Sequence, residues 1–130
     1  MTSAAPRIRA RDVGLVFVGG VVGTAARLAV TLAVGDAAGL LTVNLVGAFL
    51  LGLLTAVLSR STSARNRQIH LLLGTGALGG FTTYSALAVS ATTDLAALGI
   101  AALIAIGGVV AAAGGFGLGG GLRASAQGRR

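Results

Sequence analysis

The side chains able to do chemistry are few, and they lie inside long apolar runs of the sequence. Arg27 is a lone cation in the first run, and Asn44 is a lone amide in the second. The third run holds adjacent glycines followed by hydroxyl side chains, in the order Gly79-Gly80-Phe81-Thr82-Thr83-Tyr84-Ser85. Guanidinium, amide and hydroxyl groups donate hydrogen bonds, and an aromatic ring has a positive edge. This set of groups suits an anion.

The acidic side chains that other membrane chemistries require are missing from these runs. The chain has no glutamate, and its three aspartates, Asp12, Asp36 and Asp94, fall at the ends of the apolar runs. A proton-coupled cation carrier needs a carboxylate within the membrane, so a small multidrug-type transporter is the less favoured alternative. The chain also has no cysteine, which excludes disulfides, thiolate metal sites and a thiol nucleophile.

The elements that must position these residues are membrane-spanning helices. Of the 130 residues, 55% are apolar and only 10% are charged, against about a quarter charged in ordinary soluble domains. Four windows, 13–35, 37–59, 69–93 and 95–122, are each long enough to cross ~30 Å of hydrocarbon. The net charge of +7 would fit a nucleic-acid partner, but the apolar bulk between the charges indicates membrane lipid. We therefore expect one all-α domain, residues 1–130, with four transmembrane helices and no room for an enzymatic domain.

The placement of the arginines predicts the orientation in the membrane. The chain has ten arginines and no lysine, and nine of the arginines lie in the two tails and in the loop between the second and third windows. With four helices those three segments share one side of the membrane, and the two opposite loops carry no arginine. The positive-inside rule then places both termini in the cytoplasm, in a multi-pass protein of the cell membrane.

Several polar features inside the windows have two interpretations each. The stretch 79–85 is a weak helix centre, so the third helix is expected to be broken there, and a side chain on Gly79 is expected to fill the break. Carbonyls freed at the break would hold a small hard cation, or the threonine hydroxyls would bond back to carbonyls at a simple kink. Arg27 either serves function or extends to the membrane interface. Asn44 either ties helices together or lines a polar path, and His70 is given no role.

Three segments, taken together, resemble the CrcB/Fluc family of fluoride channels. The stretch 19–27 resembles the glycine-rich run of the family's first helix, which ends in arginine. Residues 39–52, which include Asn44, resemble its second-helix asparagine motif, and residues 79–85 resemble the break in its third helix. The similarity covers the first three helices, in order and with matching lengths.

This resemblance implies a passive, fluoride-selective channel that lets fluoride leave the cytoplasm and so reduces its toxicity. Members assemble as antiparallel dimers of four-helix subunits, with two fluoride pathways along the interface and a structural sodium ion at the dimer centre. By position, the backbone carbonyls of Gly79 and Thr82 would hold the sodium ion, which is not transported. Asn44 would donate to fluoride, and Arg27 would lie in the vestibule. The residues expected along the fluoride pathway are Asn44, Thr83, Tyr84 and Ser85.

Two departures from the family pattern bear on the partner subunit. Leu87 stands where the pathway has its second aromatic position, and no serine or threonine occurs between Leu95 and Leu122. An antiparallel homodimer needs a chain that inserts both ways, which the arginine asymmetry of nine to none opposes. We therefore expect a heterodimer with a homologous four-helix subunit of opposite orientation, in preference to a homodimer. The alternative is that this chain is an accessory, mainly structural subunit of such a channel.

Overall fold

The computed structural model describes residues 9–58 and 63–127, and all regular structure in this part of the chain is helical. Its elements are α1 (Ala10–Val34), α2 (Asp36–Leu58), α3 (Ala64–Ile69), η1 (His70–Leu78), α4 (Gly79–Phe81), α5 (Tyr84–Ser90) and α6 (Leu95–Gln127). Four stretches are long and apolar enough to cross a membrane: Ala10–Val34, Asp36–Leu58, Ala64–Ser90 and Leu95–Gly121. The prediction of an all-α protein with four membrane-spanning segments is confirmed.

A glycine turn reverses the chain between the first two spans. Gly35 has a φ of 86°, a left-handed conformation that glycine adopts without steric cost, and its N–H donates to the Thr31 carbonyl at 2.9 Å. Asp36 follows directly as the first residue of α2, where a carboxylate interacts favourably with the helix dipole. The dipeptide Gly35-Asp36 therefore ends one helix and starts the next.

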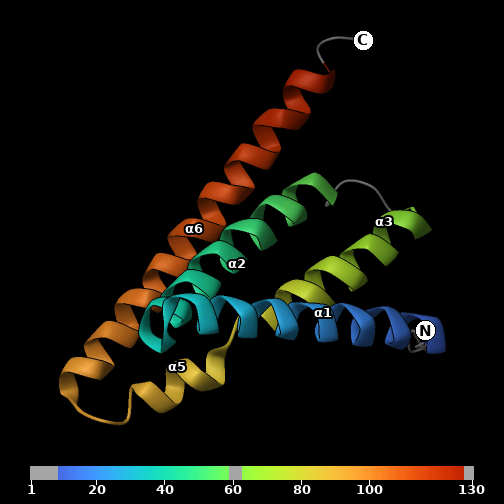
Figure 1. Ribbon diagram of the computed structural model, residues 1–130. Helices are drawn as coiled ribbons and strands as arrows, with labels where there is room; N and C mark the ends of the chain where they lie inside the picture. Colours follow the sequence, from blue (N-terminus) through green and yellow to red (C-terminus); the bar gives the residue numbers. More distant parts are fainter. Residues whose placement is uncertain (1–8, 59–62, 128–130) are drawn as a thin grey trace, which may run out of the picture.

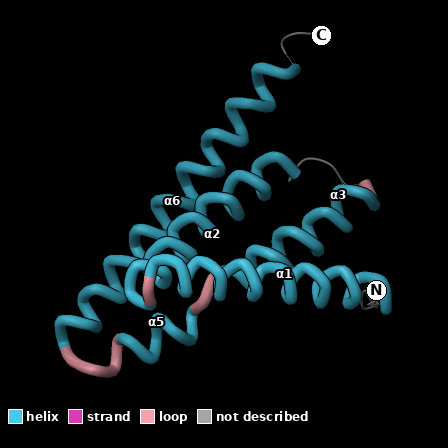
Figure 2. The backbone as a smooth tube through the Cα atoms, in the orientation of Figure 1, coloured by secondary structure: helices cyan, strands magenta, loops and turns pink. Residues whose placement is uncertain are grey.

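Small residues let α2 and α6 run side by side along most of the subunit (Figures 1 and 2). A Cβ atom on Gly52 would collide with the Ala112 carbonyl, and one on Gly115 would collide with the Phe49 carbonyl. The two backbones are therefore in direct contact, as is typical of helices that associate in lipid. Gly52 and Gly115 therefore permit the close packing of α2 on α6.

Another line of glycines joins α1 to the third span. In Figure 1, α1 crosses the direction in which α2 and α6 run. We call this line of glycines the α1–η1 seam, and its glycines are Gly19, Gly23, Gly76 and Gly80. A Cβ atom on Gly23 would collide with the carbonyl of Ala77 in η1, and one on Gly80 would lie 2.5 Å from the carbonyl oxygen of Gly20. The spacing of α1 from the third span is thus set by backbone atoms.

The third span is built from several helical pieces. The Ser63 hydroxyl caps α3 by accepting from the N–H of Asn66 at 3.2 Å, and η1 continues from α3 as a π-helix of nine residues. Helical backbone stops at Phe81 and resumes at Tyr84. Between them, Thr82 and Thr83 have extended backbones, with ψ angles of 157° and 114°. We call this dipeptide the α4–α5 link.

The short helix α5 docks on α6 through one apolar side chain. Leu87 is buried in a cluster with Ala101 and Ile104 of α6. The Thr83 hydroxyl caps α5 by accepting from the N–H of Ala86 at 3.3 Å. An apolar residue at position 87 therefore fits the environment that α6 provides within this subunit.

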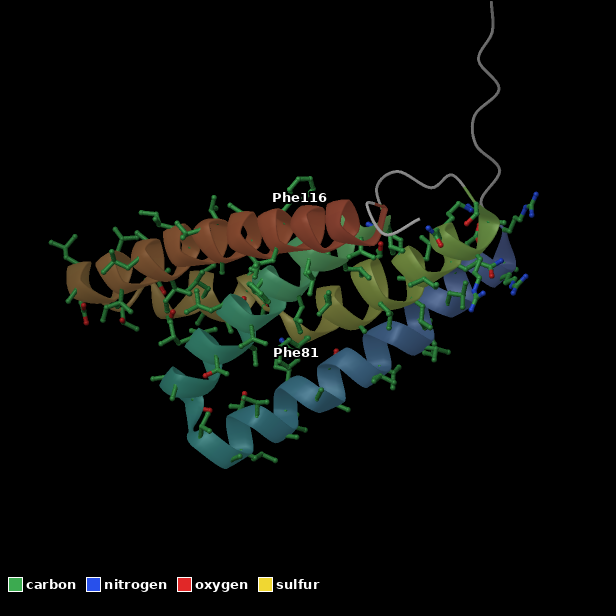
Figure 3. All side chains as sticks on the ribbon, turned by 90° about the horizontal axis from the view of Figure 1, so that it is seen from above. Phe81 and Phe116 are labelled. Carbon is green, nitrogen blue, oxygen red and sulfur yellow. The ribbon has the colours of Figure 1, made fainter. Side chains whose placement is uncertain are left out.

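Charged side chains tie the start of α1 to α3. Nitrogen-bearing side chains gather at this end of the molecule, seen in Figure 3. Nη2 of Arg67 donates to both carboxylate oxygens of Asp12, at 3.0 and 2.9 Å, and Nη2 of Arg11 donates to Oε1 of Gln68 at 3.2 Å. Asp12 is only 8% exposed, so its charge depends on this partner.

The substitution Arg67→Ala is expected to lower the free energy of unfolding by about 1–2 kcal/mol, because it leaves a buried carboxylate without its donor. Arg65→Ala is the matched control, since Arg65 is an exposed arginine of the same short helix with no ion-pair partner among the described residues. The free energies are measured by denaturation in mixed micelles. Equal losses in the two variants would contradict the stabilising role of the Asp12–Arg67 pair.

Candidate functional site

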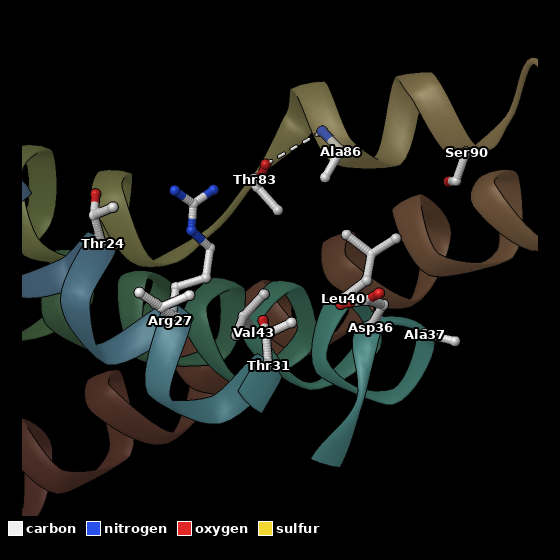
Figure 4. Close-up of a pocket in the computed structure, with 11 residues that line it drawn as sticks. Thr24, Arg27, Thr31, Asp36, Ala37, Leu40, Val43, Thr83, Ala86 and Ser90 are labelled. Carbon is white, nitrogen blue, oxygen red and sulfur yellow. Dashed lines mark hydrogen bonds between the residues drawn. The ribbon is translucent and has the colours of Figure 1, made fainter. Parts of the chain in front are cut away.

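A pocket of about 600 Å³ lies between α1, the start of α2 and the α4–α5 link (Figure 4). Its polar lining comes from four hydroxyl side chains, one arginine and one aspartate. The residues that line it are Thr24, Arg27, Leu28, Thr31, Asp36, Ala37, Leu40, Val43, Thr83, Ala86 and Ser90. The pocket therefore combines hydrogen-bond donors with apolar walls, which is the usual composition of a ligand-binding cavity.

Arg27 projects from α1 into this pocket and points toward Thr83 (Figure 4). The side chain is partly buried. Within the described part of the chain its guanidinium has no carboxylate within ion-pair distance, since the ion pair found there joins Arg67 to Asp12. Asp36, at the start of α2, lines the pocket without pairing with Arg27. A positive charge at membrane depth with no protein counter-ion favours an anion beside it.

Asn44 lies next to the pocket and contacts the α4–α5 link. Its Oδ1 accepts from the N–H of Thr83 at 3.0 Å, and its Nδ2 donates to the carbonyl of Leu40 at 2.9 Å. Asn44 therefore joins α2 to the third span across 39 residues of sequence. Of the two interpretations of Asn44, tying helices together is visible in the structure, and one amide N–H beyond that given to Leu40 remains for another acceptor.

The α4–α5 link rearranges the carbonyls that precede it. In a continuous helix the N–H of Thr83 would donate to the carbonyl of Gly79, but it donates to Asn44 instead. The Gly79 carbonyl thus loses its helical donor, whereas the Gly80 carbonyl accepts from the hydroxyl of Thr24 at 3.4 Å. Thr82 bonds back to Leu78, its hydroxyl and its N–H both donating to that carbonyl at 3.0 Å.

The backbone carbonyl oxygens of Gly79 and Thr82 are of the type that suits a small hard cation, because oxygen is the ligand that such ions prefer. Among the described residues, no three His, Cys, Asp or Glu side chains lie together. The steric expectation for Gly79 is wrong within the subunit. A Cβ atom there would meet only the Gly74 carbonyl oxygen, at an ordinary 3.9 Å, because the chain is exposed at this position.

The hydroxyl side chains at and just after the link differ in their exposure. Thr83 is 7% exposed and lines the pocket, and its hydroxyl lies 3.4 Å from that of Ser85. Ser85 is exposed, and Tyr84 is 84% exposed on the outer side of α5. The structure therefore brings Arg27, Asn44 and Thr83 together, whereas Tyr84 and Ser85 lie on the outer surface of this subunit.

Sequence reasoning missed other polar residues of the pocket. Thr24, Thr31, Asp36 and Ser90 all line it. Thr24, Arg27 and Thr31 are three, four and seven residues apart, which is the spacing of one helix face, and this signal was available in the sequence. Ser90 had no such signal, because it reaches the pocket only through the fold of α5.

The fold and the pocket define a small multi-pass membrane protein with a donor-lined cavity among its spans. The chain belongs to the CrcB family: the family model described as CrcB-like protein, Camphor Resistance (CrcB), matches residues 14–120. This match includes most of each of the four spans and confirms the family that the sequence motifs resemble.

Individual relatives carry the name of an ion channel. Fluoride-specific ion channel FluC 2 of Halobacterium salinarum is 42% identical over 99 residues, which cover 76% of this chain and 77% of the relative. FluC 2 of Leifsonia xyli is 44% identical over 88 residues and FluC 1 of Cutibacterium acnes 48% identical over 86 residues. These two matches cover 63% and 61% of this chain, and this chain spans only 61% and 60% of the two relatives. The family is one of channels and not of enzymes, as the sequence predicted.

Proposed function

We propose that this protein is a subunit of a fluoride-selective channel that exports fluoride passively from the cytoplasm. The observation that carries the proposal is the pocket in which Arg27, which has no ion-pair partner among the described residues, faces hydroxyl side chains beside Asn44. The names of the family relatives, which specify fluoride, support the choice of anion.

The residues of the pocket would act by replacing water around the anion. Fluoride is strongly hydrated, so a path too narrow for its hydration shell must supply fixed hydrogen-bond donors in place of the water molecules. Arg27 supplies positive charge, and the hydroxyls of Thr24 and Thr31 lie on the same helix face. Further along the proposed fluoride pathway, donors come from the second amide N–H of Asn44 and from the hydroxyl of Thr83. At the outer face, they come from the positive ring edge of Tyr84 and the hydroxyl of Ser85.

A structural sodium ion belongs to this proposal. Gly79 and Thr82 would hold it through their backbone carbonyls, and two subunits together would supply four oxygens. The interruption at the α4–α5 link would be the break in the third span at which the two subunits meet. The released Gly79 carbonyl supports this assignment. The bound ion would supply a fixed positive charge at the dimer centre, and it is not transported.

The exposed polar groups near the link support a partner subunit. Gly79, Tyr84 and Ser85 are exposed along a span that crosses the membrane. Lipid tails offer no hydrogen bonds to backbone carbonyls or hydroxyls, so these groups need protein or water beside them. A second four-helix subunit in antiparallel arrangement would cover them.

The arginine asymmetry favours a heterodimer. In the structure, Arg11 of α1 and Arg67 of α3 make hydrogen bonds that join the first turns of α1 to α3, so these two arginines lie at the same end of the subunit. The turn at Gly35-Asp36 lies at the opposite end of α1. Both termini are proposed to face the cytoplasm across the cell membrane. The numbered names of relatives, FluC 1 and FluC 2, are consistent with homologous partner chains.

The experiment that tests the function uses the complex purified from its own cells through a tag on this chain, so that any partner subunit is retained. Liposomes with this complex are loaded with fluoride or with chloride, and a potassium ionophore balances the charge. We expect fluoride to leave quickly and chloride to stay, as measured with ion-selective electrodes. Equal release of both anions, or transport of a cationic dye without fluoride, would overturn the proposal.

A further inference from the structure

We propose that Asn44 is a positioning residue that creates the α4–α5 link and thereby exposes the Gly79 carbonyl to the cation. This inference rests on the proposed function, because the cation is the sodium ion of that proposal. It adds a role to Asn44 that is separate from donation to fluoride: its carbonyl oxygen serves the backbone, and its amide serves the pathway.

The geometry fixes the direction in which the Asn44 amide points. Leu40 offers a carbonyl, which accepts only, and Thr83 offers an N–H, which donates only. Nδ2 must therefore face Leu40, at 2.9 Å, and Oδ1 must face Thr83, at 3.0 Å. The bond to Leu40, one helical turn earlier, is made by the amide nitrogen, and it leaves Oδ1 facing the third span.

The helix is interrupted at the residue that Asn44 contacts. The N–H of Thr82 still donates to Leu78 at 3.0 Å, four residues back as in an α-helix. The next N–H, that of Thr83, leaves this pattern and donates to Asn44. Thr83 is buried, so its N–H needs an acceptor. Without Asn44, the acceptor at hand is the carbonyl of Gly79, and bonding to it continues the helix.

A helix continued through Thr83 would close the cation site. In a continuous helix each carbonyl points along the axis into the next turn, where it is covered by its own donor. With the helix interrupted, the exposed residue Gly79 presents a carbonyl with no helical donor. The Asn44 side chain thus links the fluoride pathway to the cation site through a single amide group.

The test compares Asn44→Ala with Asn44→Asp in the complex purified from its own cells. Aspartate keeps an oxygen that accepts the Thr83 N–H but has no amide donor, and alanine has neither. Thr55→Ala is the matched control, because Thr55 makes the same type of bond to a carbonyl four residues back in α2, at 2.7 Å from Leu51, away from the link. Two quantities are measured: the sodium concentration that holds half of the complex as a dimer, with a large organic cation as replacement, and the rate of fluoride efflux.

We expect Asn44→Ala to raise the half-maximal sodium concentration about tenfold or more, equivalent to about 1.4 kcal/mol, and the control to leave it unchanged. Asn44→Asp is expected to keep the sodium dependence of the natural complex while its fluoride efflux falls, because a carboxylate repels the anion. An unchanged sodium requirement in Asn44→Ala, or a natural complex indifferent to sodium, would overturn the inference.

Asn44→Asp decides the question if the alanine variant fails to accumulate, since a raised sodium requirement in the aspartate variant also overturns the inference. The two proposals fail in different ways. A complex that depends on sodium as expected but does not release fluoride refutes the channel function and leaves the positioning role standing. A complex that releases fluoride, but whose sodium requirement is the same with and without the Asn44 side chain, refutes the positioning role and leaves the channel function standing.

Discussion

Membrane vesicles from channel-free cells that express this protein alone are expected to retain fluoride at the background rate. Vesicles from cells that also express the homologous chain that co-purifies with it are expected to release it. The reason is topological: the proposed topology places nine arginines on one side of the membrane and none on the other, so we expect nearly every copy to insert in one orientation, which would prevent an antiparallel pair of identical chains. Fluoride release is followed with an electrode after ionophore addition.

The orientation itself is checked with cysteine tags at the two termini, which the cysteine-free sequence permits without other changes. An impermeant thiol reagent is expected to label both tags from the cytoplasmic face only. Labelling from both faces, or rapid fluoride efflux from vesicles with this chain alone, would contradict the proposed heterodimer.

The second large effect is expected at the α1–η1 seam. Gly23→Ala should lower the free energy of unfolding by about 3 kcal/mol, because the added methyl group collides with the backbone carbonyl of Ala77, which cannot rotate away. It should also move Thr24 and Arg27, which follow directly on α1, and so reduce fluoride efflux.

Gly20→Ala is the matched control for this substitution. It lies on the same helix, and a Cβ atom there meets no heavy atom within 4 Å. Alanine also has a higher helix propensity than glycine, so stability should not fall. Unfolding in mixed micelles, followed by circular dichroism, gives both free energies. A Gly23→Ala variant as stable as Gly20→Ala would mean that α1 and η1 do not pack as the structure describes.

The four spans could be predicted from the sequence because hydropathy over about 20 residues is a local property. The weak helix centre after Gly79-Gly80 was also local, since β-branched threonines follow directly. The bond between Asn44 and Thr83 was not predictable in this way. It joins two spans, and its existence depends on how α2 packs against the third span.

The π-helical backbone of η1 and the freedom of Gly79 were missed for a related reason. Gly76 of η1 packs against Gly19 of α1, whereas a Cβ atom on Gly79 meets only the Gly74 carbonyl oxygen, at 3.9 Å. The sequence alone does not distinguish these glycines. Only the contacts in the structure show at which of them two helices approach closely. Leu87 shows the same limit, because its burial against α6 follows from the docking of α5.

The contact of α1 with the third span through backbone atoms has a consequence for how the pathway responds to heat and to sequence change. Side chains jump between rotamers within nanoseconds, but a carbonyl against a glycine Cα has no rotamer to change. The spacing of α1 from η1 and α4, just before Arg27 and Thr83 along the chain, is therefore set by backbone atoms. A change in an outward-facing side chain of α1, such as Val18 or Val22, therefore leaves these backbone contacts in place.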